Sequence, residues 1–440
     1  MVRKILLVCG LAAFATVATA QSPEHLHGGT TPIYAGPPLT LSAALDEALH
    51  RNPELVALRG QFEAAQLRPA QERFLMPPSF EAQIWQWPVT TANPLNTNMY
   101  MFTMQQELPG RGKRTLRAAL TEKEVELASV DIAVRARDVI KEVQRAYLDL
   151  ALARKSIDIH LESVGLLRQS ADASTAKYAA GRSSQQDVLK AVVEISRLHE
   201  DLVMHEESAA AAMARLNTLL DRDPQTIIGP VDELRERVAL PSSEALQKLA
   251  LAQHPELRAA QVGIERAQAA AAVIDRERKP DFFVGGGYML MPRMAGAWTA
   301  SAGMTWPNAP WSRGRLDAQR AEAAANVTAA SARVRVVERQ IRLAVHDAYI
   351  RAEAAGQRAS LLRTTVVPQS QQAMEVSRVA YQGDRVDFLS VVDNQRAFLD
   401  AQLSYFRALG DRELALADLD RAVGATSPGA PAASSAAEVK

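Results

Sequence analysis

The chain has 440 residues, 48% of them hydrophobic, and its 50 basic side chains balance its 50 acidic ones. This composition allows a sizeable folded protein, and the balanced charge gives no field that would favour nucleic acid. The single cysteine, Cys9, excludes an internal disulfide. After residue 20 there is no run of 18 apolar residues, so the sequence predicts no transmembrane helix.

The first segment, residues 1–20, is typical of a secretory signal peptide, with a basic start, an apolar run and a small-x-small cleavage site. Cys9 lies inside this segment, and acylation of that cysteine remains an alternative. Residues 21–40 contain four prolines and three glycines, which predicts an extended lead-in. Its two histidines are more typical of incidental polar residues than of a metal site.

The rest of the chain contains two copies of one unit. Tyr147 recurs 202 positions later as Tyr349, whereas Tyr178 recurs 203 positions later as Tyr381. Because this register holds over most of each half, the sequence predicts a structural duplication. The expected divisions are repeat 1 at 41–223, a linker at 224–241, repeat 2 at 242–424 and a disordered tail at 425–440.

Each repeat is expected to contain a helix, two strands and a long helical hairpin, in that order. In repeat 1 these elements are a helix at 41–75, strands at about 79–87 and 98–108, and a hairpin at about 114–221. In repeat 2 they are a helix at 242–279, strands at about 281–290 and 297–306, and a hairpin at about 314–423.

The hairpin segments carry apolar residues at the three-four spacing of a left-handed coiled coil. The first heptad stripe consists of Ala136, Val143, Leu150, Ile157 and Val164, and the second of Ile341, Val345, Ala348, Ala352 and Ala355. A turn is expected near Gly181, with Ser183 or Ser184 as the cap of the returning helix. The first helix would then be roughly 96 Å long, which predicts an elongated protein.

The strands differ from those of an ordinary soluble sheet. In 297–306, apolar residues bounded by Trp298 and Trp306 alternate with small polar ones, as in a lipid-facing strand. The alternative is a half-buried edge strand of a soluble domain, and the secretion signal favours the membrane. Four strands cannot close a barrel, so copies of the chain would have to share one. Three copies would supply twelve strands and a pore.

With its helix, strands and hairpin in this order and present twice, the chain resembles the TolC family of bacterial outer-membrane efflux proteins over residues 41–424. The motifs that carry the resemblance are Asn52–Leu55, His254–Leu257, the junction Glu107–Arg114, and the tip stretches Tyr178–Gly181, Tyr381–Asp384 and Asp393–Arg396. The junction is most similar to the CzcC- and CusC-like heavy-metal branch.

The resemblance implies a mainly α fold with a small membrane β part: a homotrimer with a twelve-stranded β-barrel in the outer membrane, continued by an α-helical periplasmic tunnel. It also implies a passive exit duct for cargo, with heavy-metal cations expected. The implied partners are a periplasmic membrane-fusion adaptor, an inner-membrane pump of the RND type and outer-membrane lipid. No cofactor, metal site or catalytic residue is expected.

The resemblance also implies two sets of residues at the hairpin tips. The candidate periplasmic gate is Tyr381, Asp384, Arg385, Asp387 and Asp393. The candidate adaptor-docking tip is Gly181, Arg182, Ser183, Val188, Leu189 and Gly383. Asp384 departs from the family pattern, because most members have glycine three residues after the tip tyrosine.

Several alternatives remain open from the sequence. Arg111, Lys113 and Arg114 form either a solvated basic turn or a set of partners for carboxylates or lipid phosphates. The methionines in and around the strands are apolar filler or, less favoured, soft-metal ligands. No HExxH or GxSxG motif supports an enzyme. The main functional alternative is a soluble periplasmic coiled-coil adaptor or scaffold.

Overall fold

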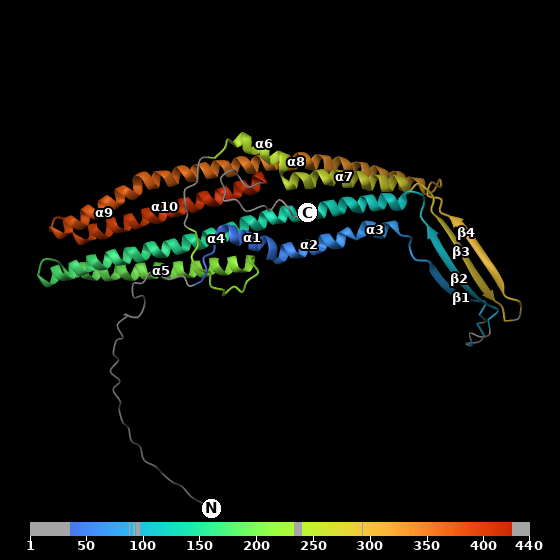
Figure 1. Ribbon diagram of the computed structural model, residues 1–440, viewed down its shortest axis with the longest axis horizontal. Coiled ribbons are helices and arrows are strands. Elements are labelled where there is room, and N and C mark those ends of the chain that lie inside the picture. Colours follow the sequence, from blue (N-terminus) through green and yellow to red (C-terminus); the bar gives the residue numbers. More distant parts are fainter. Residues whose placement is uncertain are drawn as a thin grey trace, which may run out of the picture.

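The computed structural model describes residues 36–87, 89–90, 93, 97–232, 240–292 and 294–424. This part of the chain is an elongated, mostly helical rod with a four-stranded sheet at one end (Figure 1). The expected signal peptide, most of the lead-in, the tail at 425–440 and residues 233–239 of the expected linker lie outside the described residues. Among the described helices, none combines the length and the hydropathy that crossing a membrane requires.

The helical segment expected at 41–75 is divided into three helices. They are α1 (Leu41–Arg51), α2 (Pro53–Gln66) and α3 (Arg68–Arg73). Asn52 ends α1 and caps α2, since its side-chain oxygen accepts the backbone N–H groups of Glu54 and Leu55. Pro53 follows in the first turn of α2, where its missing N–H is not needed.

Repeat 2 is interrupted in the same way, between α6 (Ser243–Gln253) and α7 (Pro255–Arg276). Here His254 is the cap, and its Nδ1 accepts the N–H of Glu256 at 3.2 Å. The single helix expected at the start of each repeat is therefore divided, with a break at its Pro-Glu-Leu motif. Each motif opens the second helix, because a capping residue before proline stops the first one.

Strands from both repeats form one antiparallel sheet in the order β1-β2-β3-β4. The strands are β1 (Ser79–Trp85), β2 (Met99–Leu108), β3 (Phe282–Leu290) and β4 (Ala297–Met304). Phe102 pairs with Tyr288, which in turn pairs with Trp298 across the sheet. The duplication thus supplies one hairpin of strands from each copy to a shared sheet.

Two long helical hairpins run from the sheet toward the opposite end of the rod (Figure 1). The first consists of α4 (Lys113–Ala179) and α5 (Gln185–Leu219). The second consists of α8 (Arg313–Leu361), a π-helical turn η1 (Leu362–Val366), α9 (Val367–Gln382) and α10 (Phe388–Val423). The corresponding helix of the first hairpin, α4, has no such turn, so η1 is a difference between the two copies.

The heptad stripes form the cores of these hairpins. In the first hairpin Val143, Leu150 and Ile157 are buried, and in the second Ile341 and Val345 are buried. Near the middle of the rod, each repeat has its own hydrophobic cluster. Toward the tips, one cluster joins α4 and α5 to α10, so the two hairpins share a core there.

The two equivalent caps predict a difference in pH response. Burial lowers the pKa of His254, so the folded protein binds fewer protons than the unfolded chain near pH 6. The contribution of His254 to stability should therefore be fully present above about pH 6.5, the pKa of an unfolded histidine. It should decrease as the pH falls through the lowered pKa of the folded state. His254→Asn, which installs the cap of repeat 1, should remove roughly 1–3 °C of the acid-induced fall in melting temperature.

Melting curves of the purified protein at pH 7.5 and pH 5.5 measure this difference. His346→Asn serves as the control, because it makes the same replacement at an exposed histidine that caps no helix. An equal acid shift in the His254→Asn variant and the unmodified chain would contradict the prediction.

Candidate functional site

The residues proposed for the gate and the docking tip gather at the end of the rod farthest from the sheet (Figure 1). The turn between α4 and α5 and the turn between α9 and α10 lie side by side there, held together by the hydrophobic cluster that joins α4, α5 and α10. These residues come from positions about 200 apart in the chain. The structure thus brings both candidate sets to one place.

The two turns have matching backbone geometry. Gly181 has φ +72° and Asp384 has φ +58°, so both lie in the left-handed region. Glycine adopts this conformation freely, whereas aspartate does so at some cost. Asp384 thus occupies the position at which the family pattern has glycine, and it retains the backbone shape of a glycine turn.

The side chain of Asp384 is held by Lys177 from the other hairpin. The Lys177 ammonium donates to Asp384 Oδ1 at 2.5 Å and to the carbonyl oxygen of Tyr381. It also lies 4.2 Å from the centre of the Tyr381 ring. The hydrogen bond from Lys177 lowers the pKa of Asp384 below its usual value. We call this set of contacts between Lys177, Tyr381 and Asp384 the tip contact.

Lys177 was not among the residues that the sequence patterns indicated. It lies in the last turn of α4, where a basic residue is ordinary because it complements the helix dipole. Nothing local in the sequence indicates that its partners are more than 200 residues away. The one available signal was that the residue equivalent to Asp384 in repeat 1 is Gly181. The turn of repeat 2 therefore carries a negative charge that the turn of repeat 1 lacks, and such a charge indicates a basic partner.

Tyr381 lies in the shared core and not on the surface. It is 5% exposed, and its ring meets that of Phe388 edge-on at 5.5 Å between centroids. Its hydroxyl has no hydrogen-bond partner among the described residues. In this chain Tyr381 therefore supports the turn by packing, and its carbonyl oxygen anchors Lys177.

The remaining gate candidates have different surroundings. Arg385 is exposed at the turn. Asp387 caps α10 by accepting the N–H of Ser390 at 3.2 Å, and the hydrogen bond from the Ser390 hydroxyl, together with that from this N–H, lowers the pKa of Asp387. Asp393 lies further along α10, 3.8 Å from Arg396, which pairs with the buried Glu194 of α5. Asp384 is thus the candidate acid that forms an ion pair with the first hairpin.

The docking candidates form the outer rim of the same end. Gly181, Arg182 and Gly383 are exposed, and Ser183 and Val188 are half-buried. Ser184, one of the two serines expected to cap α5, is the cap, since it accepts the N–H of Asp187. Leu189 is 57% exposed and begins an apolar stripe along α5 that continues with Val192 and Val193.

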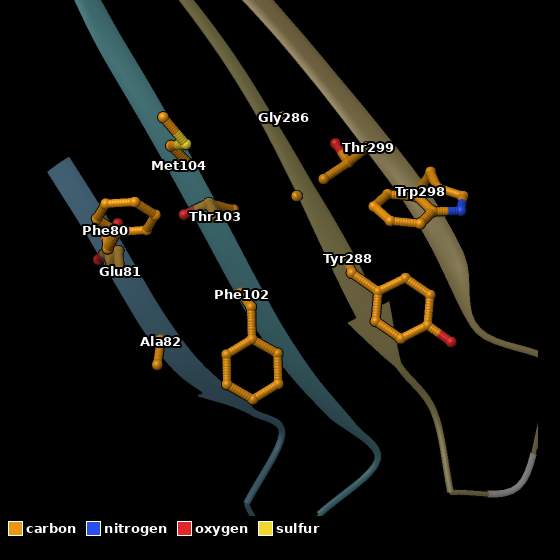
Figure 2. Close-up of a pocket in the computed structure, with 11 residues that line it drawn as sticks. Phe80, Glu81, Ala82, Phe102, Thr103, Met104, Gly286, Tyr288, Trp298 and Thr299 are labelled. Carbon is orange, nitrogen blue, oxygen red and sulfur yellow. The ribbon is translucent and has the colours of Figure 1, made fainter. Parts of the chain in front are cut away.

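At the opposite end of the molecule, one side of the sheet is apolar and exposed. We call it the apolar sheet face; its large members are Phe80, Ile84, Phe102, Met104, Phe282, Val284, Leu290, Trp298 and Met304. Figure 2 shows part of this face, where Phe102, Tyr288 and Trp298 come from three neighbouring strands. None of the described helices covers it (Figure 1), which is unusual for a sheet in water.

The other side of the sheet is largely polar or small. Glu81, Thr103, Gln105, Thr299 and Ser301 point to this side, given the pairing register. All five tryptophans lie near strand ends: Trp85, Trp87 and Trp298 at the ends away from the helices, and Trp306 and Trp311 at the helix side. Aromatic residues at both ends of an apolar band are typical of membrane strands.

The methionines divide between the two sides of the sheet. Met104 is exposed on the apolar sheet face, as expected of apolar filler. Met101 and Met289 pair across β2 and β3 on the other side. Among the described residues, no group of three or more His, Cys, Asp or Glu side chains is placed to hold a metal ion.

The basic junction between β2 and α4 is the third notable site. Lys113 is 1% exposed and donates to Glu277 Oε2 and Asp281 Oδ2, both at 2.8 Å. Asp281 also accepts the N–H of Gly110 at 2.7 Å, and Arg117 donates to Glu277. Burial alone would raise the pKa of Glu277, but the hydrogen bonds from Lys113 and Arg117 lower it.

Of the alternatives for this basic turn, the structure shows pairing with carboxylates for Lys113. Arg111 remains exposed, and Arg114 donates to the carbonyl oxygen of Arg73. The Lys113 cluster joins the start of the first hairpin to the end of α7 and the start of β3. It therefore ties the two repeats together where the sheet meets the helices.

Comparison with known proteins supplies the family. The model of the family described as "Outer membrane efflux protein" matches residues 44–222 and again residues 246–425. The cobalt-zinc-cadmium resistance protein CzcC of Cupriavidus metallidurans is 26% identical over 431 residues, which are 96% of this chain and 100% of that protein. The two family matches coincide with the two expected repeats.

Solved structures share the fold. The outer membrane channel MtrE of Neisseria gonorrhoeae superposes with a TM-score of 0.71 at 18% identity, covering 88% of this chain and 89% of that one. CusC superposes with a TM-score of 0.70 at 16% identity, covering 88% of this chain and 92% of that one. At these identities the likeness concerns the fold alone.

The buried Lys113 predicts a large effect of its removal. Lys113→Met would leave two adjacent carboxylates without their shared cation, so we expect a loss of roughly 2–4 kcal/mol in stability. Denaturation of the purified protein, followed by helical circular dichroism, measures this loss. Arg111→Met is the matched control, because Arg111 is exposed, and a comparable loss in both variants would contradict a special role for Lys113.

Proposed function

The chain belongs to the outer membrane efflux protein family, and we propose that it is the outer-membrane channel of a tripartite efflux system. In this proposal it is a passive exit duct, and the energy comes from an inner-membrane pump of the RND type connected through a periplasmic adaptor. Family members are transport channels, so membership agrees with the expectation that the chain is not an enzyme.

The observation that carries the proposal is the apolar sheet face. An exposed apolar band bounded by tryptophans at both strand ends fits hydrocarbon between two interfacial layers. A soluble periplasmic adaptor, the main alternative, would expose this face to water at a large cost. Contact of this face with lipid removes that cost, because the apolar side chains are then no longer exposed to water.

The strand count supports a homotrimer. The four strands of one chain leave β1 and β4 each paired on one side within the described sheet. Backbone groups at such edges must be satisfied inside a membrane, and a closed barrel does so. Three copies give twelve strands, enough for an open lumen lined by the polar side of the sheet. The helical hairpins then form the wall of a periplasmic tunnel.

We assign the closed end of this tunnel to the tip contact. Opening would move the α9–α10 turn away from the α4–α5 turn, which requires Asp384 to leave Lys177. Arg385, Asp387 and Asp393 remain candidate constriction residues, with Tyr381 as the packing anchor. The rim formed by Gly181, Arg182, Ser183, Val188, Leu189 and Gly383 remains the candidate surface for the adaptor.

Heavy-metal cations are the proposed cargo. The support is the relative described as a cobalt-zinc-cadmium resistance protein, which this chain matches along its full length. The polar side of the sheet adds a surface of hydroxyl, amide and carboxylate groups along which hydrated cations could pass.

The tip contact predicts that its loss opens the channel. Lys177→Met and Asp384→Asn should each raise the mean current of purified channels in planar bilayers by roughly two- to fivefold, the range expected for a surface ion pair. Asparagine tolerates the left-handed backbone, so the second variant changes only the charge.

Glu375→Gln is the matched control. It removes an acidic group from the same part of the second hairpin, but its partner Arg378 lies on its own helix at 2.7 Å. Unchanged currents in both tip variants, or an equal rise in the control, would refute the gate assignment.

The cargo proposal predicts a selective phenotype. A strain lacking this gene should become more sensitive to Co²⁺, Zn²⁺ and Cd²⁺, and its sensitivity to dyes and antibiotics should change little. Growth inhibition across both sets of compounds measures this. Increased sensitivity to drugs alone would assign the duct to a different cargo, while trimers in the outer-membrane fraction would still support the channel itself.

A further inference from the structure

The two repeats differ in length by one residue between their cores near the middle of the rod and their tips. The interval from Tyr147 to Tyr178 is 31 residues, whereas that from Tyr349 to Tyr381 is 32. The caps of the structure follow the same change. Thr40 and Ser242, which cap α1 and α6, are 202 apart, and Ser184 and Asp387, which cap α5 and α10, are 203 apart.

The structure shows where the additional residue is accommodated. α4 is unbroken over 67 residues, but its counterpart contains the five-residue π turn η1 between α8 and α9. A π turn closes each hydrogen bond over one residue more than an α turn, so it takes up a one-residue insertion. The flanking faces keep their orientation, since Ser174 in α4 and Ser377 in α9 are both buried at an offset of 203.

Packing within the chain is thin around this turn. No residue from 360 to 373, all of them described, is buried, whereas the matching part of α4 buries Ile159, Val164 and Leu167 among others. The nearest core is a cluster of three residues, Ala359, Ala408 and Leu409. It separates the cluster of repeat 2 from the cluster shared at the tips.

Two further features loosen the backbone here. Pro368 stands in the first turn of α9, where it cannot donate a hydrogen bond to the preceding turn. Thr364 in η1 donates its hydroxyl to the carbonyl oxygen of Ser360, in the last turn of α8, at 2.8 Å, and a threonine hydrogen bond of this kind slightly destabilises and bends a helix. Proline and π turns are the usual origins of helix bending.

We infer that η1 is a one-residue insertion that serves as the bending point of the second hairpin, about which α9 moves when the tip contact opens. In the first hairpin α4 is continuous and remains straight, so the asymmetry of the duplicated chain decides which hairpin moves. The role in opening rests on the proposed function, but the presence of a bending point does not.

The first test deletes Thr364. Removing one residue from the π turn should restore a continuous α-helix, keep both flanking faces and allow normal assembly. In hydrogen–deuterium exchange of the purified full-length protein, amides in 362–373 should exchange faster than those in 160–170 of α4. The deletion should slow the exchange of the amides that follow the turn in the second hairpin by about tenfold.

Deletion of Glu162 is the matched control, because it removes an exposed residue from the uninterrupted α4. This deletion should rotate the part of α4 beyond residue 162 by about 100° relative to the part before it, and so prevent assembly. If the Thr364 deletion also fails to assemble, the residue is not a removable insertion and the inference is wrong. Unchanged exchange in an assembled Thr364 deletion would overturn it as well.

The second test separates the bending point from the gate. The Thr364 deletion is combined with Asp384→Asn, and we expect the raised current of the single variant to return to the level of the unmodified channel. A raised current that persists in the combination would refute the role of η1 in opening. If Asp384→Asn alone raises no current, the gate assignment fails, and the exchange experiment still decides whether η1 bends.

Discussion

The length of α4 is the constraint on which the rest of the fold depends. A helix of 67 residues is about 100 Å long and cannot be covered by any single partner of ordinary size. It packs against α1, α2 and α3, against α5, and against α7 and α10 of the other repeat. The order of elements in both copies follows from the need to bury successive parts of one apolar stripe.

Polar contacts between the repeats occur from the sheet end of this helix to its tip. Near the sheet, Lys113 is buried between two carboxylates, and further along, Lys123 pairs with Glu265 at 2.6 Å. Near the middle, Arg421 pairs with Asp138 at 2.6 Å. Near the tip Arg396 pairs with the buried Glu194, and at the turn the half-buried Lys177 pairs with the exposed Asp384. Ion pairs therefore join the two repeats from the sheet to the tip, and among these carboxylates that of Asp384 is the most exposed.

The sequence alone predicted the features that are periodic or duplicated. The heptads, the alternating strands and the place of the tip turn followed from spacing. The two helix interruptions at Asn52 and His254 were missed, because capping involves only a few residues and leaves no periodic pattern. Lys177 and the Lys113 cluster depend on partners more than 150 residues away, which no spacing rule reveals. The change of offset was visible, but only the π turn explains it.

The edges of the sheet have a consequence for how the protein reaches its membrane. The helices can satisfy their backbone groups in water within one chain, but β1 and β4 each present an open edge in the described sheet. In the proposed homotrimer, newly exported chains would therefore fold their rods singly, while insertion would have to wait for encounters between copies. Biogenesis would then depend on the concentration of unassembled subunits. Chaperones that shield strand edges would determine how many of these subunits remain able to assemble.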